Sequence, residues 1–459
     1  MAQAGEAAAP TRGHPASGGV LPGATPRGEA TSAADAWTLR ERLAWVGRFR
    51  RAIARSEGEF AELAADEIGK DSFETLVSDL MPLLASCRWH ERHARGLLRP
   101  RRRRGGAIWQ LGQRHWMRRE PLGLVGIIAT WNYPVQLLGI QLVQALVGGN
   151  RVVVKPSERC PRTQALLLDL AVDAGVPEGA LRSLPATREA GVALVEDEPI
   201  DHLVFTGSTA VGRRIAERLA ARLVPSTLEL TGCDSAIVLE DADADLAARS
   251  IAAAVRLNAG QTCMAPRRVL VAESIADRFE AALRSQFAAM QPVQMCDEGE
   301  ATDARRLAGA AGEGRLLRPD VVACEPTDEL ARGEHFGPVL ALLRVGSRAE
   351  AFELSRSFGQ HLATCLFTRD AGRTDDLHRL STGAVTINDA VIPSAHPGSP
   401  IPALGRSGWG ASQGREGLLA MTRPVHVSTT SRRLRVPADP PTPRQAERLR
   451  SFVRWWYGR

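Results

Sequence analysis

Between residues 123 and 239 the sequence alternates short apolar runs with longer segments of helical periodicity. Short apolar runs bounded by turn residues are typical of buried strands, whereas apolar residues that recur every three or four positions predict helices. The predicted strands and helices follow one another as 124–128, 136–147, 151–155, 163–174, 200–206 and 210–223. This alternation predicts an α/β fold with a parallel, doubly wound sheet.

Polar residues stand where two of these predicted strands end. Asn132 comes shortly after the first strand, and Lys155 closes the next, followed by Ser157 and Glu158. Ligands gather at the carboxyl ends of parallel strands, so we expect these side chains to face one cleft. An amide there can donate to a developing oxyanion. Lys155 can bind phosphate or sugar hydroxyls, and Glu158 can accept from a ribose hydroxyl. Each alone is equally typical of a turn or a solvated strand end.

Lysine is almost absent from this sequence. Only Lys70 and Lys155 are lysines among the 58 Lys and Arg residues. A compact ammonium and a planar guanidinium are not equivalent at a tight site. The retention of Lys155 therefore favours a binding role for it, whereas no role for Lys70 follows from its local sequence.

The segment from Phe205 to Gly212 joins a predicted strand to a predicted helix. Gly207 allows close approach of the backbone to a ligand, and Ser208 begins the helix. The free N–H groups and the dipole of a helix N-terminus favour a phosphate. The segment lacks the G-x-G-x-x-G spacing, so as an isolated pattern it is a weak signal.

Cys263 lies in a predicted loop, Asn258-Ala-Gly-Gln-Thr-Cys263, and Glu229 lies about thirty residues earlier in a predicted strand. A loop cysteine near a carboxylate is suited to covalent catalysis. A single cysteine is more often a small buried apolar residue, which is the interpretation we give to the other six.

The order of these motifs resembles the aldehyde dehydrogenase superfamily. The resemblance runs from about Trp37 to Val427, and the short N-terminal region is similar to its class 3 branch. The motifs that carry it are Gly126-Ile-Ile-Ala-Thr-Trp-Asn132, Val154-Lys-Pro-Ser-Glu158, Phe205-Thr-Gly-Ser-Thr209, Gly260-Gln-Thr-Cys263 and Glu334-His-Phe-Gly-Pro338.

The resemblance implies NAD(P)-dependent oxidation of an aldehyde to a carboxylic acid. Cys263 would be the nucleophile, Asn132 and the Cys263 backbone N–H would hold the oxyanion, and Glu229 would activate water to release the acid.

The resemblance also implies how the cofactor would be held. Its residues would be Lys155, Ser157 and Glu158 at the adenosine ribose, Gly207 and Ser208 at the pyrophosphate, and Trp131, Glu334 and Phe336 towards the nicotinamide. NAD is favoured by Glu158, whose charge would repel a 2′-phosphate, with NADP also possible.

The same comparison suggests a division of the chain. We expect an NAD(P)-binding domain over 36–230, a catalytic domain over 231–423, and a small β oligomerisation element. That element would combine a hairpin at 105–119 with a strand at 424–435, and would make the protein a homodimer or a higher oligomer.

Three departures from the family pattern keep two alternatives open. Thr231 and Cys233 stand where the motif after the base usually has glycine and lysine, and the Pro402–Gly410 block differs near the aldehyde tunnel. The alternatives are a CoA-acylating or acyl-reducing dehydrogenase, and a catalytically impaired member that acts as a binding protein.

The two ends of the chain differ from its middle. Residues 1–35 are mainly Ala, Gly, Pro, Ser and Thr, which predicts a disordered tail. Residues 436–459 form a Pro-rich linker and a basic amphipathic helix, which is typical of a segment that touches a membrane surface, its own domain or a partner subunit.

Charge and cysteine usage exclude several classes of protein. The net charge is only +6, so we interpret the Arg99–Arg104 run as a solvated loop and expect no nucleic-acid partner. The seven cysteines are scattered, which predicts a cytoplasmic protein with neither a disulfide framework nor a metal site. We expect no transmembrane segment, because the most apolar stretch is interrupted by polar residues and glycines.

Overall fold

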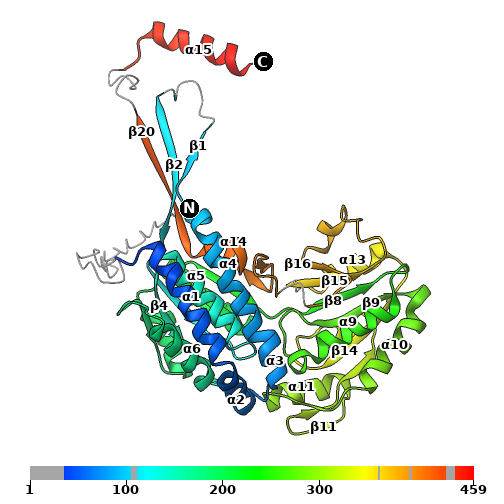
Figure 1. Cartoon of the computed structure of the whole chain (residues 1–459). Coiled ribbons are helices and arrows are strands. Elements are labelled where there is room, and N and C mark those ends of the chain that lie inside the picture. Colours follow the sequence, from blue (N-terminus) through cyan, green and yellow to red (C-terminus); the bar gives the residue numbers. More distant parts are fainter. Residues whose placement is uncertain are drawn as a thin grey trace, which may run out of the picture.

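Two six-stranded sheets, each covered by helices, form the body of the protein (Figure 1). The structure is a computed structural model that describes residues 36–104, 110, 112–359, 362–391, 395–430 and 440–458. The tail expected at 1–35 therefore lies outside the described residues.

The first sheet has the strand order β18-β7-β6-β3-β4-β5, in which all neighbours are parallel except the β18–β7 pair. Its strands are β3 (Leu124–Ile128), β4 (Arg151–Lys155), β5 (Leu181–Ser183), β6 (His202–Gly207), β7 (Ser226–Leu230) and β18 (Gly408–Trp409). The reversal of order on either side of β3 is a doubly wound arrangement, so this prediction is confirmed.

Helices cover both faces of this sheet. One face packs against α1 (Leu39–Arg55), α4 (Met81–Leu98), α5 (Gln136–Gly148) and α6 (Pro161–Asp173). The other face packs against α7 (Arg188–Glu196) and α8 (Thr209–Ala221). Every residue of α5 is buried, because this helix lies between the sheet and the outer helices α1 and α4. Covering both faces explains why these strands are continuous apolar runs.

The second sheet is parallel throughout, in the order β13-β14-β9-β8-β15-β16. Its strands are β8 (Asp234–Val238), β9 (Pro266–Ala272), β13 (Asp320–Ala323), β14 (Val339–Val345), β15 (Ala363–Phe367) and β16 (Ala384–Ile387). Helices α9 (Ala244–Arg256) and α10 (Ala276–Ala288) cover one face, and α11 (Glu298–Ala308), α12 (Glu329–Arg332) and α13 (Arg348–Ser357) cover the other.

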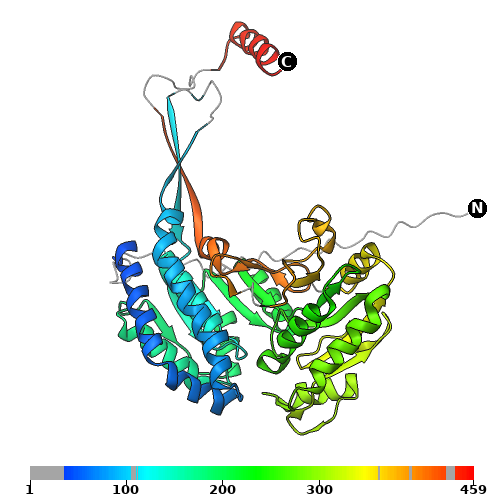
Figure 2. The same ribbon diagram turned by 45° about the vertical axis from the view of Figure 1, so that its right-hand side comes forward.

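A third sheet projects from the body, as Figure 2 shows in the turned view. It contains β1 (Arg101–Arg103), β2 (Gln113–Pro121) and β20 (Thr422–Thr430), all antiparallel. The prediction of a loop at Arg99–Arg104 is wrong, because Arg101–Arg103 pair with β2, although their side chains are exposed. The hairpin expected at 105–119 therefore begins earlier, and residues 105–109 and 111 lie outside the described residues.

The chain returns to the first sheet near its end. β18 pairs with β7, and α14 (Gly414–Ala420) packs against α5 and α4. These elements lie within the expected catalytic segment 231–423, yet they contact the first sheet. The domain boundaries stay a prediction, and β18 and α14 pack with the first domain although they fall within 231–423.

Shorter elements complete the described part of the chain. They are α2 (Glu57–Ile68), α3 (Ser72–Glu74), a π-helical turn (Thr75–Leu80), β10 (Val293–Gln294), β11 (Gly312–Glu313), β12 (Leu316–Leu317), β17 (Ile401–Pro402), β19 (Ala411–Ser412) and the C-terminal helix α15 (Pro443–Tyr457).

Candidate active site

The carboxyl ends of β3, β4, β6 and β7 open into one cleft. Parallel pairing puts these strand ends at the same edge of the sheet, and Asn132, Lys155, Ser208 and Glu229 lie there. The cavity has a volume of about 1050 Å³. All the site residues predicted from the sequence line it, namely Trp131, Asn132, Lys155, Ser157, Glu158, Gly207, Ser208, Glu229, Cys263, Glu334 and Phe336.

Cys263 and Glu229 are in contact, although Glu229 lies in β7 of the first sheet and Cys263 precedes β9 of the second. The Cys263 thiol donates to Glu229 Oε1 across 3.8 Å, and the Ser412 hydroxyl donates to Glu229 Oε2 across 2.8 Å. Burial raises the pKa of the Glu229 carboxyl, which the hydrogen bonds from Ser412 and Cys263 partly offset. Burial also raises the pKa of the Cys263 thiol, and the nearby Glu229 charge raises it further. The geometry therefore places a carboxyl oxygen within reach of the thiol proton.

The nucleophile loop, residues 257–263, has a backbone that few residues tolerate. Asn258 and Ala259 have φ of 51° and 52°, and Gly260 has φ of 73°. Non-glycine residues in this left-handed region persist only when their surroundings fix them. The buried Arg267 guanidinium does so by donating to Gly260 O across 2.8 Å and Thr262 O across 2.9 Å. The same guanidinium acts against the rise in the pKa of Cys263.

The Asn132 side chain is fixed at both ends of its amide. Its oxygen accepts from the Thr130 hydroxyl across 2.9 Å, and its Nδ2 donates to Gln261 O across 3.0 Å. Gln261 is two residues before Cys263, so this bond joins the β3 loop to the nucleophile loop. A primary amide has two N–H donors, and the second remains to bind an oxyanion near Cys263.

Lys70, for which the sequence suggested no role, stabilises the position of Asn132. Its fully buried ammonium forms an ion pair with Asp79 and donates to Asn132 O across 3.2 Å. Asp79 Oδ1 in turn accepts from the backbone N–H groups of Val135 and Gln136, at the start of α5. The pair thus fixes both Asn132 and the helix that follows it. The rarity of lysine was the one sequence signal that could have identified this residue.

One end of the cleft suits the adenosine part of a dinucleotide. The buried Lys155 ammonium and the half-exposed Glu158 carboxylate are 2.5 Å apart. Ser157 lies between them in the sequence and is fixed by its backbone N–H, which donates to Gln164. Four arginines also line this cavity, and no signal in the sequence could have separated them from the many others. They are Arg159, Arg188, Arg214 and Arg218.

The N-terminus of α8 lies at the middle of the cleft. Ser208 caps this helix by accepting from the backbone N–H of Val211 across 3.4 Å. The remaining N–H groups of the first turn and the helix dipole favour a phosphate at this place.

The end near Cys263 has aromatic walls and a carboxylate. Trp131 and Phe336 pack edge to face with their centroids 5.9 Å apart, and the Arg159 guanidinium lies over the Trp131 ring. Glu334 lies 3.6 Å from the Arg406 guanidinium. The cavity thus offers, one after another, an ammonium group, a helix N-terminus, aromatic rings and carboxylates. This series of groups fits an extended dinucleotide.

Thr231 and Cys233, which depart from the family motif that follows Glu229, both form hydrogen bonds. Thr231 donates to Gly207 O across 3.5 Å. Cys233 is fully buried, accepts from the Arg268 guanidinium across 2.6 Å and donates to Gly333 O across 3.1 Å. A positive charge therefore lies beside position 233 although the lysine of the family motif is absent.

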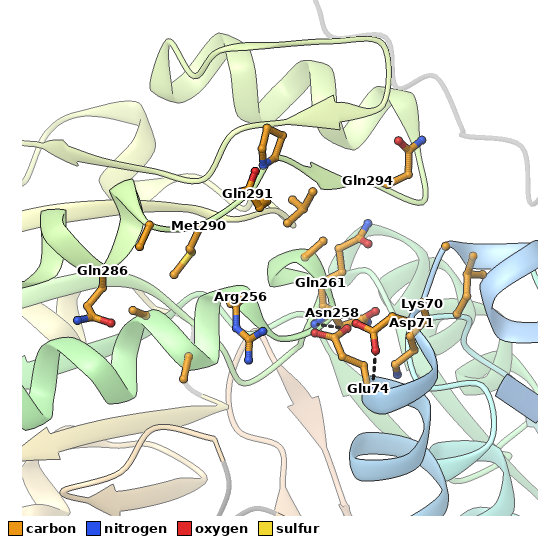
Figure 3. A pocket seen from close by; sticks show the side chains of 18 of the residues that line it. Lys70, Asp71, Glu74, Arg256, Asn258, Gln261, Gln286, Met290, Gln291 and Gln294 are labelled. Carbon is orange, nitrogen blue, oxygen red and sulfur yellow. Dashed lines mark hydrogen bonds between the residues drawn. The ribbon is translucent and has the colours of Figure 1, made fainter. Parts of the chain in front are cut away.

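A second cavity, of about 570 Å³, lies on the other side of the nucleophile loop (Figure 3). Asn258 and Gln261 line it together with Glu74 from α3, whose carboxylate accepts from the Asn258 backbone N–H across 3.1 Å. Cys263 lines the larger cavity and not this one. The nucleophile loop is thus a wall between two cavities, with the thiol facing the cleft described above.

Known proteins match this chain over most of its length. The profile of the aldehyde dehydrogenase family matches residues 27–298 and 288–427. A coniferyl aldehyde dehydrogenase of a Pseudomonas species is 31% identical over 420 residues, which are 84% of this chain and 86% of that protein. An NADP-dependent glyceraldehyde-3-phosphate dehydrogenase of Streptococcus equinus is 35% identical over 332 residues, 67% of this chain and 69% of that one.

A similar structure is that of a Mycobacterium tuberculosis aldehyde dehydrogenase in complex with NAD+. It superimposes with a TM-score of 0.78 at 28% identity, covering 88% of this chain and 86% of that one. A cysteine in contact with a carboxylate at the wall of a cleft is suited to covalent catalysis. The chain belongs to the aldehyde dehydrogenase family and is an NAD(P)-dependent aldehyde dehydrogenase. Its place in the class 3 branch stays a prediction.

Within the part of the chain that the structure describes, no helix is both long and apolar enough to cross a membrane.

Replacing Lys70 tests the support beneath Asn132. Lys70→Met leaves the Asp79 carboxylate buried without its cation, and removing one partner of a buried ion pair costs about 3–5 kcal/mol. We expect the free energy of unfolding, measured in urea, to fall by about that amount. Lys155→Met removes the other lysine, whose partner is half exposed, so its cost is about 1 kcal/mol or less. Equal losses in the two variants would contradict the account.

Proposed function

We propose that Cys263 is the nucleophile of this dehydrogenase and attacks the aldehyde carbonyl carbon. The observation that carries the proposal is the 3.8 Å contact between its thiol and Glu229 at the wall of the cofactor cleft. The thiol proton passes to Glu229, and the sulfur forms a thiohemiacetal. The free N–H of Asn132 and the backbone N–H of Cys263 would stabilise the oxygen as it becomes negative.

The bound NAD(P) supplies the acceptor for the hydride that leaves the substrate carbon, and a thioester on Cys263 remains. Once Glu229 has passed the thiol proton to solvent, it takes a proton from water, which attacks the thioester and releases the carboxylic acid. Cys263 leaves as a thiolate and takes that proton back from Glu229. A carboxylate with a raised pKa is suited to both proton transfers, because its pKa is closer to the working pH than that of an ordinary glutamate.

We also propose which residues hold the cofactor. Lys155 and Glu158 would bind the adenosine ribose, with Ser157 in the same turn, and Gly207 and Ser208 would bind the pyrophosphate. Towards the reacting end Trp131 would line the cleft, Glu334 would bind the second ribose, and Phe336 would pack on the nicotinamide. We propose NAD as the preferred form, because the half-exposed Glu158 carboxylate would face a 2′-phosphate.

Two alternatives receive less support from the geometry. CoA-dependent release is disfavoured because Glu229 contacts the nucleophile and would direct water to the thioester. A catalytically impaired binding protein is disfavoured because Arg268 places a cation beside Cys233 and Thr231 leaves the Cys263–Glu229 contact intact.

We propose a cytoplasmic homodimer or higher oligomer. All seven cysteines are free thiols in the structure, which suits a reducing compartment. The sheet of β1, β2 and β20 projects from the body, and a narrow antiparallel sheet gains stability from a packing partner (Figure 1). Its edge strand β20, on the side away from β1, is therefore suited to bind a second copy.

A panel of aliphatic and aromatic aldehydes tests the proposed chemistry. With NAD, and separately NADP, the protein should form NADH or NADPH with at least one aldehyde, faster with NAD. Cys263→Ser should lower that rate by at least about a thousandfold, because a neutral hydroxyl is a far weaker nucleophile. Cys296→Ser is the matched control and should retain the rate, because Cys296 does not line the cleft. Equal activity of the two variants would overturn the role of Cys263.

Ser412→Ala tests the proton chemistry of Glu229. Glu229 must be deprotonated to act, and the Ser412 hydrogen bond lowers its pKa. Loss of that bond therefore raises the pKa, and the acid limb of the kcat profile should move to higher pH by about one unit. Ser407→Ala, which removes a hydroxyl that donates to Thr231 O in the same region, should leave the limb in place. A Ser412→Ala profile that does not move would contradict Glu229 as the base.

A further inference from the structure

The C-terminal helix α15 stands apart from both sheets, beyond the tip of the projecting third sheet (Figures 1 and 2). None of its residues is buried, although it carries several large apolar side chains. Thr442 caps it and forms a capping box with Gln445, so the helix begins at a defined residue. Among the described residues, none covers the apolar face of this capped helix, so the face is available to a partner.

The apolar side chains of α15 lie on one face. Leu449, Phe452, Val453 and Trp456 follow the spacing of successive helical turns. Leu449 is 62% exposed, Val453 is 47% exposed and Trp456 is 45% exposed. The Phe452 and Trp456 rings stack with their centroids 6.0 Å apart, which makes a continuous apolar surface. The Trp455 ring extends this surface at its edge, because its centroid lies 6.5 Å from that of Phe452 and 5.6 Å from that of Trp456.

The opposite face is basic. The helix contains four arginines, Arg444, Arg448, Arg450 and Arg454, against one glutamate, Glu447. Arg450 and Arg454 share that glutamate, at 3.2 and 3.1 Å. The helix therefore carries a net charge of about +3, half of the net charge of the whole chain.

A second basic element lies at the same end of the molecule. Strand β1 consists of Arg101, Arg102 and Arg103, and all three side chains are exposed. The half-exposed Trp116 lies opposite Arg102 in the neighbouring strand. Both features at this end combine exposed cations with an aromatic side chain, as in proteins that bind an anionic lipid surface.

The helix is too short to cross a bilayer. Its 15 residues span about 22 Å, whereas the hydrocarbon core is about 30 Å thick. A short helix with a basic face and an aromatic apolar face lies in the plane of the membrane surface instead. A second copy of α15 is a poorer partner, because it would cover the apolar face but leave the arginines of the opposite face without an anionic partner.

We propose that α15, together with β1, is a peripheral membrane-binding element that docks on anionic phospholipids. Phe452, Trp456, Leu449 and Val453 enter the boundary between headgroups and acyl chains, while the arginines bind lipid phosphates. The proposal is independent of the catalytic chemistry and concerns where the enzyme works.

The test is co-flotation of the full-length protein with vesicles of equal parts phosphatidylcholine and phosphatidylglycerol, compared with phosphatidylcholine alone. We expect binding to the anionic vesicles that weakens with added salt, and little binding to the neutral ones. Trp456→Ser should weaken binding by about tenfold or more. Arg448→Gln and Arg444→Gln should each weaken it by about fivefold.

Leu223→Ser is the control, because it replaces another exposed apolar side chain, 90% exposed, that lies on the body of the protein and not on α15. It should weaken binding much less than Trp456→Ser, and both variants should oxidise aldehydes at the parent rate. No flotation, equal flotation with neutral vesicles, or equal losses in these two variants would overturn the proposal. It would also be overturned if Trp456→Ser halves the molecular mass measured by light scattering without a change in flotation, since the face would then join two copies.

Discussion

The hydrogen bond between the Cys263 thiol and Glu229 is the contact on which the catalytic architecture depends. The carboxylate belongs to β7 of the first sheet, whereas the thiol precedes β9 of the second. The reacting pair therefore exists only while the two sheets keep their relative position. Two further links across the same boundary maintain it, since Asn132 donates to Gln261 O and Asn258 donates to Asn132 O across 2.9 Å.

Buried cations stabilise this junction, and each does so differently. Lys70 fixes the carbonyl of Asn132 through its pair with Asp79, and Arg267 fixes the carbonyls of the nucleophile loop. Arg268 lies beside Cys233. Burial raises the pKa of the Cys263 thiol, and the Arg267 charge acts against this rise, so it favours the anionic sulfur when the proton leaves.

The sequence predicted the sheet and the cleft well, for a physical reason. Parallel strands must end at one edge, so polar residues such as Asn132, Lys155 and Glu158 at successive strand ends had to converge. The roles of Lys70 and Arg267 could not be predicted in this way, because they depend on contacts between elements far apart in the chain. The basic strand β1 was misinterpreted as a loop, because its pairing with β2 outweighs the usual solvation of an arginine run.

The central claim is that Cys263 carries the substrate as a thioester and that Glu229 supplies the water that removes it. The most direct measurement is the intact mass of the parent protein, quenched with acid during the first turnover of its reaction with NAD and an aldehyde substrate. The account predicts one equivalent of NADH and one acyl group, located on Cys263 by peptide mapping. An unmodified protein, or an acyl group on another cysteine, would contradict it.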